Sequence, residues 1–208
     1  MKATKRRIVD LSYKLQLSHI GSCLGAVDII EDIYNIKRAK DLFVLSSGHA
    51  GLALYVVLEK MYGFDAEELF HLHGVHPNRD KIHKIDCSTG SLGQGLPIAL
   101  GMAMADKEKN VYCLISDGEC AEGSIWESLM LAKKQNITNL KVYLNYNGYS
   151  AYDKTDINLL INMTKATGFP VRIIRTSPPS LFFFRGLQAH YHVLNHDDYD
   201  ELVEELDK

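Results

Sequence analysis

The sequence predicts an α/β fold: a doubly wound, mainly parallel sheet with helices on both faces. Two observations lead to this class. Short apolar segments alternate with amphipathic helical segments along the 208 residues, as in proteins built from βαβ units. Residues 110–116 are almost continuously apolar, as strands buried on both faces are. The chain is long enough for one large domain with its own core. We therefore expect residues 1–208 to form a single domain.

The first half of the chain is expected to contain mostly helices around one strand. Gly63 follows an apolar helical run and predicts its C-terminal cap, and Asp65 predicts the N-cap of the next helix. Apolar residues fall near one helical face in the first segment. The expected elements are a helix over 4–17, a glycine-containing loop over 18–25, a helix over 26–36, a strand over 41–48, and helices over 49–63 and 65–73.

The second half begins with a long loop over 74–95 and then alternates regularly. Gly168 is expected to end one of its helices. A connection rich in proline and phenylalanine precedes a last, acidic helix. The expected elements are helices over 96–107, 122–136, 156–168 and 196–208, and strands over 110–116, 139–147 and 170–176.

Composition excludes several classes of protein. The net charge is −3 with 24% charged residues, and no basic stripe suited to nucleic acid is present. No apolar stretch is long enough to span a membrane, and the first ten residues do not resemble a signal peptide. Four cysteines without a CxxC pair indicate reduced thiols in a cytoplasmic protein. A zinc site that combines Cys87 with nearby histidines is a less favoured alternative.

Polar residues follow the ends of three predicted strands. His49, Asp117 and Asn147 occupy these positions, and ligands of such folds bind beyond the carboxyl ends of the strands. Asn147 comes 30 residues after Asp117, which returns the chain to the same sheet edge. Oxygen ligands suit Mg²⁺, which can bridge a carboxylate and a diphosphate. Alone, the Asp117-Gly118 pair is more typical of a plain turn, but with Asn147 it indicates a metal-diphosphate site.

Four motifs in this order resemble the transketolase family. They are "LSHIGSCLGAVDII", "DLFVLSSGHAGLALYVVL", "DCSTGSLGQGLPIALGMAMA", and "SDGECAEGSIWE" followed by "NYNGY". The last pair resembles the thiamine diphosphate motif, which begins Gly-Asp-Gly and ends with Asn about thirty residues on. The resemblance covers residues 5 to about 150. The tail, "AHYHVLNHDDYDELVEELD", matches more loosely, so residues 177–208 are expected to form a C-terminal extension.

The resemblance implies roles for specific residues. His19, His49, His76 and His190 correspond to histidines of the substrate channel, and His49 also to a cofactor contact. Gly90 and Leu92 correspond to contacts with the aminopyrimidine end of the cofactor, and Gly118 to a diphosphate contact. Asp117, Asn147 and the Tyr149 carbonyl correspond to the ligands of Mg²⁺ (or Ca²⁺). Glu122 corresponds to an acid that links two cofactor sites across a dimer interface.

Several of these residues have simpler interpretations. His19 and His49 could be loop and helix-start residues whose rings only satisfy local hydrogen bonds. Three histidines within "HLHGVHP" could suggest a metal site, although the match at His76 favours a substrate contact. Glu122 could simply begin its helix, where a negative charge is favourable. His192 could take the role assigned to His190.

The sequence also departs from the family pattern. Ser116 replaces the first glycine of the cofactor motif, and "SHIG" lacks the usual proline. The segment between the cofactor motif and the tail is short, so one βα unit is expected to be absent and the sheet edge trimmed. The pyrimidine-binding half of a transketolase has no counterpart in these 208 residues.

These features predict the N-terminal subunit of a two-chain transketolase. It would use thiamine diphosphate to transfer a two-carbon ketol unit between sugars or sugar phosphates. A separate pyrimidine-binding subunit would complete an α₂β₂ assembly. The alternatives are a related enzyme acting on a 2-oxo acid, such as a 1-deoxyxylulose-5-phosphate synthase or a dehydrogenase component, and a non-catalytic scaffold protein of the same fold.

Overall fold

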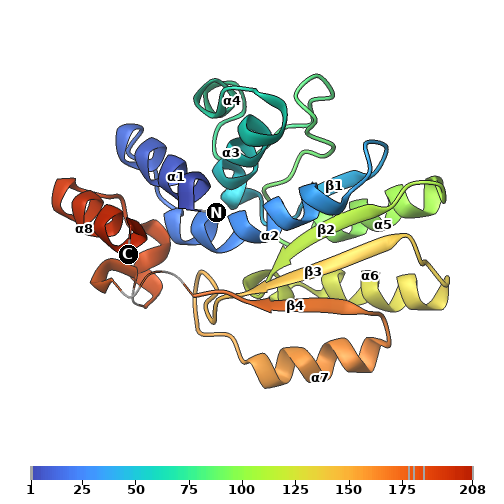
Figure 1. Cartoon of the computed structure of the whole chain (residues 1–208). Helices are drawn as coiled ribbons and strands as arrows, with labels where there is room; N and C mark the ends of the chain where they lie inside the picture. Colours follow the sequence, from blue (N-terminus) through green and yellow to red (C-terminus); the bar gives the residue numbers. More distant parts are fainter. Residues whose placement is uncertain (1, 178, 180, 185, 208) are drawn as a thin grey trace.

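Four parallel strands form one sheet in the order β1-β2-β3-β4 (Figure 1). The computed structural model describes residues 2–177, 179, 181–184 and 186–207. The strands are β1 (Leu42–Leu45), β2 (Val111–Ser116), β3 (Leu140–Tyr146) and β4 (Val171–Arg175). Every pairing is parallel, and Cys113 at the centre lies between Val44 and Val142. Within the described residues the sheet ends at β4.

Helices cover both faces of this sheet (Figure 1). Successive β2 residues point to opposite faces, so Tyr112 and Leu114 join one core, and Cys113 and Ile115 the other. The first core contains α1 (Lys2–Lys14), α2 (Ile20–Ile36), α3 (Gly51–Tyr62), α4 (Ala66–His73) and α8 (His196–Asp207). The second contains α5 (Gly95–Ala105), α6 (Gly123–Lys134) and α7 (Ile157–Thr167). The predicted parallel α/β sheet with helices on both faces is confirmed.

Helix termini follow the capping residues of the sequence. Asp65 caps α4 by accepting hydrogen bonds from the backbone N–H groups of Glu67 and Glu68. Gly63 and Gly168 end α3 and α7 with φ angles of 76° and 67°, a left-handed conformation that glycine adopts without steric cost. The predicted caps at Asp65, Gly63 and Gly168 are confirmed.

Two predicted boundaries near the N-terminus are wrong. The first helix ends at Lys14 instead of residue 17, and Gln16 has a φ of 53°. The predicted loop over 18–25 belongs mostly to α2, which begins at Ile20 after His19 in a left-handed conformation. Gly25 lies inside this helix, and a Cβ at this position would approach Thr176 Oγ1 at 3.2 Å. Gly25 therefore allows close packing, and neither Gly21 nor Gly25 breaks the helix.

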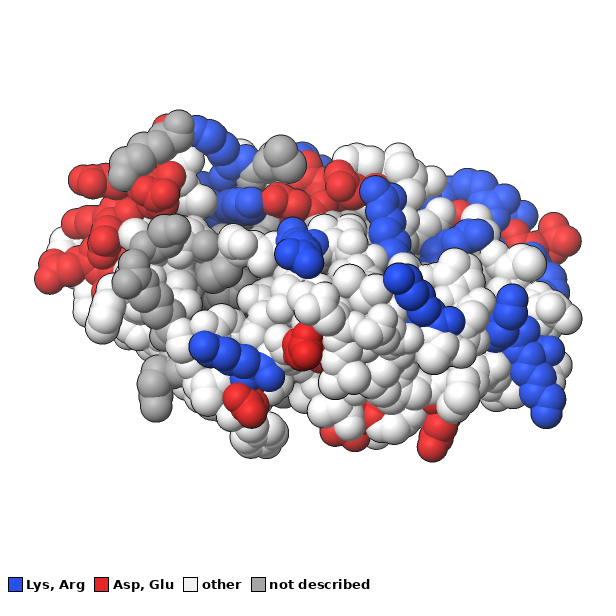
Figure 2. Space-filling view, turned by 90° about the horizontal axis from the view of Figure 1, so that it is seen from below, with Lys and Arg blue, Asp and Glu red and all other residues white. Residues whose placement is uncertain are grey.

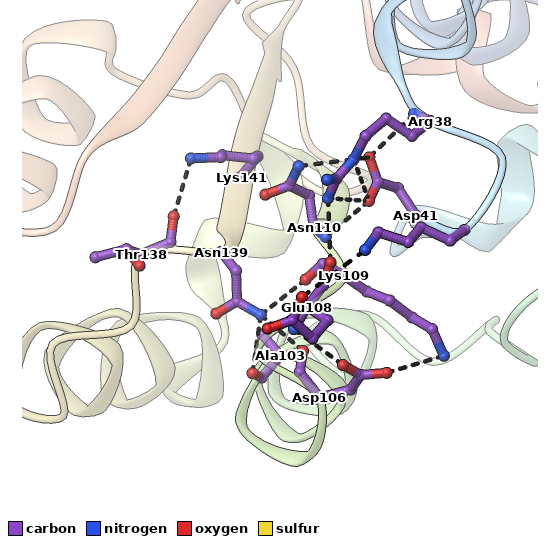
Figure 3. A network of polar contacts seen from close by, with 11 residues as sticks. Arg38, Asp41, Ala103, Asp106, Glu108, Lys109, Asn110, Thr138, Asn139 and Lys141 are labelled. Carbon is purple, nitrogen blue, oxygen red and sulfur yellow. Dashed lines mark hydrogen bonds and ion pairs between the residues drawn. The ribbon is translucent and has the colours of Figure 1, made fainter.

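A network of hydrogen bonds connects residues at the amino ends of the strands (Figure 3). The Asp41 carboxylate accepts hydrogen bonds from the Arg38 guanidinium and from the backbone N–H groups of Arg38 and Asn110. The Asn139 amide donates to the carbonyl groups of Ala103, Asp106 and Lys109. Burial raises the pKa of Asp41, but the hydrogen bonds from Arg38 and Asn110 outweigh burial, so the pKa is lowered. Side chains at the amino ends of the strands therefore stabilise the fold, and the candidate site is to be sought at the carboxyl ends.

The C-terminal helix returns to the N-terminal helix. Tyr199 of α8 donates a 2.9 Å hydrogen bond to Asp10 of α1 and accepts one from Arg6. Acidic side chains gather at the end of the molecule formed by α8 (Figure 2). Lys208, the last residue of the predicted helix, lies outside the described residues. Within the described part of the chain, no helix combines the length and apolar character that crossing a bilayer requires.

Candidate functional site

A cleft of about 250 Å³ lies at the carboxyl ends of β1, β2 and β3. The loops after these strands form one wall. The start of α2 and the described residues around 184–191 form the other. Residues from widely separated parts of the sequence line it, including Gly21, Ser47, His49, Gly90, Leu92, Asp117, Gly118, Asn147, Tyr149, Phe184 and His190. The structure thus brings most of the site residues expected from the sequence into one cleft.

Asp117 lies directly after β2 and is almost completely buried. Its Oδ2 accepts hydrogen bonds from the Thr155 hydroxyl at 2.6 Å and from the Gly148 backbone N–H at 2.8 Å. Among the residues that the structure describes, its Oδ1 accepts one longer bond, 3.2 Å, from the Gly118 N–H. Burial raises the pKa of Asp117, although the hydrogen bonds oppose this shift. One oxygen is therefore fixed by the protein, and the other retains capacity for a ligand.

Asn147 and Tyr149 follow β3 on the loop that faces Asp117. The Asn147 Oδ1 accepts a 2.9 Å hydrogen bond from the Tyr149 N–H, which fixes a tight turn. The Tyr149 carbonyl oxygen lies 3.8 Å from the position that a Cβ would take at Gly118. A carboxylate, an amide and a carbonyl group therefore supply oxygen donors to one cleft. This donor set fits a hard divalent cation such as Mg²⁺ or Ca²⁺.

Gly118 begins a short 3₁₀ helix, Gly118–Ala121. A Cβ at this position would lie 3.2 Å from Ser150 Cα and 3.3 Å from Ser150 Cβ. Such contacts are tighter than ordinary packing allows. Glycine thus permits the loops after β2 and β3 to approach each other, and it also leaves its backbone facing the cleft.

Three histidines form a cluster, in which His49 and His190 line the cleft and His19 packs against both rings. The ring centroids of His19, His49 and His190 lie 4.5 to 5.5 Å apart. Burial, followed by the neighbouring imidazoles, lowers the pKa of His49 to about 3 and that of His19 to about 4. Burial also lowers the pKa of His190. All three rings are neutral at pH 7, so each offers one N–H donor and one nitrogen acceptor.

His76 and His192 occupy different positions relative to this cluster. His76 is exposed, and its ring lies beside Gly90, whose Cβ would be 3.1 Å from the ring. It lies near enough to His19 and His49 to lower their pKa values. His192 instead bonds Asp198 at 2.9 Å and stacks on Phe183. The structure thus places His190, and not His192, among the histidines of the cleft.

Close backbone contacts hold the glycine-rich loop against the loop after β1. A Cβ at Gly48 would lie 2.8 Å from the backbone of Thr89 and Gly90. The Thr89 hydroxyl donates a 2.7 Å hydrogen bond to the Leu45 carbonyl group. These contacts position the backbone of Gly90 and the side chain of Leu92 at the cleft wall.

Glu122 lies outside the cleft. It precedes α6 with an exposed side chain that makes no capping hydrogen bond. Its Cβ and Cγ pack over Gly93, which has a φ of 79°. Within the described chain, the carboxylate faces solvent near the glycine-rich loop.

Glu119 and Thr155 support the site through hydrogen bonds, and the sequence did not predict either residue. Glu119 is fully buried, and burial raises its pKa. It accepts hydrogen bonds from the Ser46 hydroxyl at 2.6 Å and from the backbone N–H groups of Gly93 and Ser116 at 3.0 Å. The sequence does not distinguish Glu119 from the neighbouring Asp117 and Glu122. Nothing in the sequence near Thr155 indicated its bond to Asp117.

The zinc alternative involving Cys87 is wrong in the described structure. Cys87 is buried, and its thiol donates to the neighbouring Ser88 carbonyl group. Among the described residues, the one cluster of His, Cys, Asp or Glu with metal-binding spacing does not include it. All four cysteines are free and buried.

Sequence comparisons identify proteins similar to this chain. Residues 2–167 match the family model described as "Transketolase, thiamine diphosphate binding domain". An apulose-4-phosphate transketolase subunit of Phocaeicola vulgatus is 34% identical over 164 residues, which cover 69% of this chain and 58% of that protein. Human transketolase is 39% identical over 150 residues, covering 62% of this chain and 24% of that protein.

A second subunit relative shows the same partial coverage. The 6-deoxy-6-sulfo-D-fructose transketolase subunit SqwG of Clostridium sp. is 33% identical over 154 residues, which cover 64% of this chain and 56% of that protein. The chain thus spans a little over half the length of these two subunits and about a quarter of human transketolase.

Solved transketolase structures share the fold. A Pichia stipitis transketolase superposes with a TM-score of 0.76 over 99% of this chain and 40% of that chain, at 19% identity. The Campylobacter jejuni transketolase gives a TM-score of 0.71 over 98% of this chain and 42% of that chain, at 23% identity. At these identities the likeness shows the fold alone.

Proposed function

The chain belongs to the transketolase family of thiamine diphosphate-binding domains, and from this premise we propose that it is the diphosphate-binding subunit of a two-chain transketolase. With a separate pyrimidine-binding subunit, it transfers a two-carbon ketol unit between sugars or sugar phosphates. The observation that carries this proposal is that Asp117, Asn147, Tyr149, His49 and His190 line one cleft. The names of two relatives as transketolase subunits support the two-chain form.

Asp117, Asn147 and the Tyr149 carbonyl group are the proposed ligands of Mg²⁺ or Ca²⁺, which would hold the diphosphate. Gly118 allows the diphosphate to approach the backbone of its short helix. Gly90 and Leu92, which also line the cleft, are proposed to contact the aminopyrimidine end of the cofactor. When bound, thiamine diphosphate would supply a nucleophilic thiazolium carbon and a cationic ring that stabilises a carbanion.

The histidines of the chain are proposed to accept and donate protons around the cofactor. Because His19, His49 and His190 are neutral at pH 7, each ring can accept a proton from a sugar hydroxyl or donate a hydrogen bond to one. His76 at the rim is proposed to contact the part of the substrate that extends out of the cleft. The exposed Glu122 is proposed to face a neighbouring subunit near a second cofactor site.

We also propose an assembly, a domain organisation and a location for the chain. An α₂β₂ assembly would place the cleft between two kinds of chain. Residues 177–208 belong to the same domain, as the Tyr199–Asp10 contact and the position of His190 support; Pro178, Ser180, Arg185 and Lys208 lie outside the described residues. The free, buried cysteines support a cytoplasmic location.

The test uses the chain purified together with the pyrimidine-binding chain of the same organism. Calorimetry with thiamine diphosphate and Mg²⁺ should show metal-dependent binding that Asp117→Ala abolishes and Asp32→Ala retains, since Asp32 is an exposed carboxylate on α2. Ketol transfer between sugar phosphates should accompany binding. Binding without transfer, or CO₂ release from pyruvate, would overturn the transketolase assignment. Absence of binding in the paired chains would overturn the cofactor assignment.

A further inference from the structure

A second group of ligating side chains lies at the end of α4, away from the cleft. His73, the last residue of α4, lies near Asp80 and His83 of the following loop. One ligand atom from each lies within 4.8 Å of the other two. None of the three lines the cofactor cleft. The cluster therefore needs an explanation of its own.

The Asp80 carboxylate is fixed by its own loop. Its Oδ1 accepts hydrogen bonds from the backbone N–H groups of Ile82 and His83. Asp80 and Ile85 exchange two backbone hydrogen bonds of 2.8 Å, which close the loop like a short hairpin. The remaining oxygen, Oδ2, points at both imidazoles, 2.6 Å from His83 Nδ1 and 3.5 Å from His73 Nε2.

His73 supplies the observation that points to a ligand. Its side chain is 5% exposed, and its buried Nε2 has no hydrogen-bond partner in the part of the chain that the structure describes. Leaving a buried imidazole nitrogen unpaired is unfavourable. A metal ion between His73, Asp80 and His83 would satisfy this nitrogen.

We propose that His73 Nε2, Asp80 Oδ2 and His83 Nδ1 form a binding site for a divalent transition metal of the zinc class. Two imidazoles and one carboxylate are a common zinc donor set. Zinc bonds of about 2.0–2.2 Å in tetrahedral geometry separate ligand atoms by about 3.3–3.6 Å. The His73–Asp80 separation of 3.5 Å already has this value, and the His83–Asp80 contact of 2.6 Å needs to open by about 0.7–1.0 Å to reach it.

The fourth ligand of this site is a water molecule. The side chains of Asp80 and His83 are 17% and 29% exposed, so the cluster opens to solvent on their side. The metal would join the end of α4 to the loop that carries His76 and leads to Gly90. Two further hydrogen bonds stabilise this loop. The Arg79 backbone N–H donates to the Ser88 hydroxyl, and the Thr89 backbone N–H donates to the Pro77 carbonyl group. Metal binding would therefore stabilise the rim of the cofactor cleft.

The test measures Zn²⁺ binding to the full chain after removal of metal by chelation. Calorimetry should show a site that His83→Gln and His73→Gln each weaken at least tenfold. The matched control is His71→Gln, because His71 lies on the same helix with a side chain 64% exposed. A His49→Gln background separates this site from any binding by the histidines of the cleft. Co²⁺ should give the visible absorption of a tetrahedral site in the wild-type chain.

The outcomes decide the proposal. Zinc bound with unchanged affinity by His83→Gln and His73→Gln, or no zinc binding by the folded wild-type chain, would overturn it and leave a hydrogen-bonded His-Asp-His cluster. Circular dichroism checks the fold of each variant. If His73→Gln fails to fold, the partly exposed His83→Gln and the Co²⁺ spectrum still decide. Zinc should also raise the melting temperature of the wild-type chain and of His71→Gln, but not of His83→Gln.

Discussion

The Ser46 hydroxyl donates a 2.6 Å hydrogen bond to the buried carboxylate of Glu119. The same carboxylate accepts from the Gly93 and Ser116 backbone N–H groups. One side chain thus joins the loop after β1, the glycine-rich loop and the loop after β2. These three loops carry His49, Leu92 and Asp117, so Glu119 positions the cleft without lining it.

Glu119→Gln should destabilise the chain. Each carboxylate oxygen accepts from a backbone N–H, so in either orientation the Gln amide nitrogen would face another donor. We expect a loss of about 1–3 kcal/mol in the free energy of unfolding, measured by urea denaturation. Glu127→Gln is the control, because Glu127 is exposed on the neighbouring helix α6. Equal stabilities of the two variants would contradict the role of Glu119.

Replacing Gly48 by alanine should lower the stability of the chain, whereas replacing Gly101 by alanine should raise it. A Cβ at Gly48 would lie 2.8 Å from the backbone of Thr89 and Gly90, whereas Gly101 in α5 has open space around it. We expect Gly48→Ala to cost about 1–3 kcal/mol through overpacking. Gly101→Ala should gain about 0.4–1 kcal/mol, because alanine favours a helix and restricts the unfolded chain.

Urea denaturation of both alanine variants and the wild-type chain checks this pair. Cofactor binding provides a second readout, since displacement of Gly90 should weaken binding in Gly48→Ala only. A stable Gly48→Ala chain with wild-type binding would show that the two loops can separate without consequence.

The arrangement of the cleft was predictable where strand ends and motifs determine it. Asp117 and Asn147 each follow a buried apolar run, and parallel strands bring such ends to one edge. The start of α2 was not predictable, because Gly21 and Gly25 are helix-breaking by propensity. Tertiary packing overrides that propensity, since Gly25 allows close contact with Thr176.

The bonds that support the site were harder to predict. Thr155 reaches Asp117 from a loop with no pattern of its own, and only the folded chain brings them together. The His73–Asp80–His83 cluster has the same origin. The three histidines in "HLHGVHP" do not cluster with one another, because His76 lies beside Gly90 whereas His73 lies near Asp80 and His83.

Acidification should destabilise the folded chain partly through His49. Burial and the neighbouring His190, His19 and His76 lower the pKa of His49 to about 3 from an ordinary value of 6.5. Between these values the unfolded chain binds a proton that the folded chain does not bind. The free energy of unfolding therefore falls as the pH falls from about 6.5 toward 3. His49→Gln should reduce this slope.

The measurement is the free energy of unfolding between pH 7 and pH 4 for the wild-type chain, His49→Gln and the exposed His71→Gln. His71→Gln should keep the wild-type slope. An unchanged slope in His49→Gln would mean that this ring does not remain neutral in the folded chain. Since the slope is compared, a uniform loss of stability in the variant does not affect the result.

Thr155→Val should weaken cofactor binding while the chain remains folded. Valine keeps the shape of threonine but removes the hydroxyl that donates the 2.6 Å bond to Asp117 Oδ2. Of the two donors to this oxygen in the described part of the chain, the Gly148 N–H would then remain. Loss of a residue that orients a metal ligand typically costs about 10- to 100-fold in affinity. We expect a decrease of this size for thiamine diphosphate with Mg²⁺, measured by calorimetry in the presence of the pyrimidine-binding chain.

The matched control for this variant is Thr138→Val, because Thr138 is exposed at the amino end of β3. It should bind the cofactor like the wild-type chain. Titration of Mg²⁺ at a fixed cofactor concentration separates loss of metal affinity from loss of diphosphate contacts. If Thr155→Val shows an unchanged requirement for Mg²⁺, the Asp117 carboxylate does not need Thr155 for its orientation. If Mg²⁺ at higher concentration restores binding, Thr155 acts through the metal ligand, as the geometry of the loop implies.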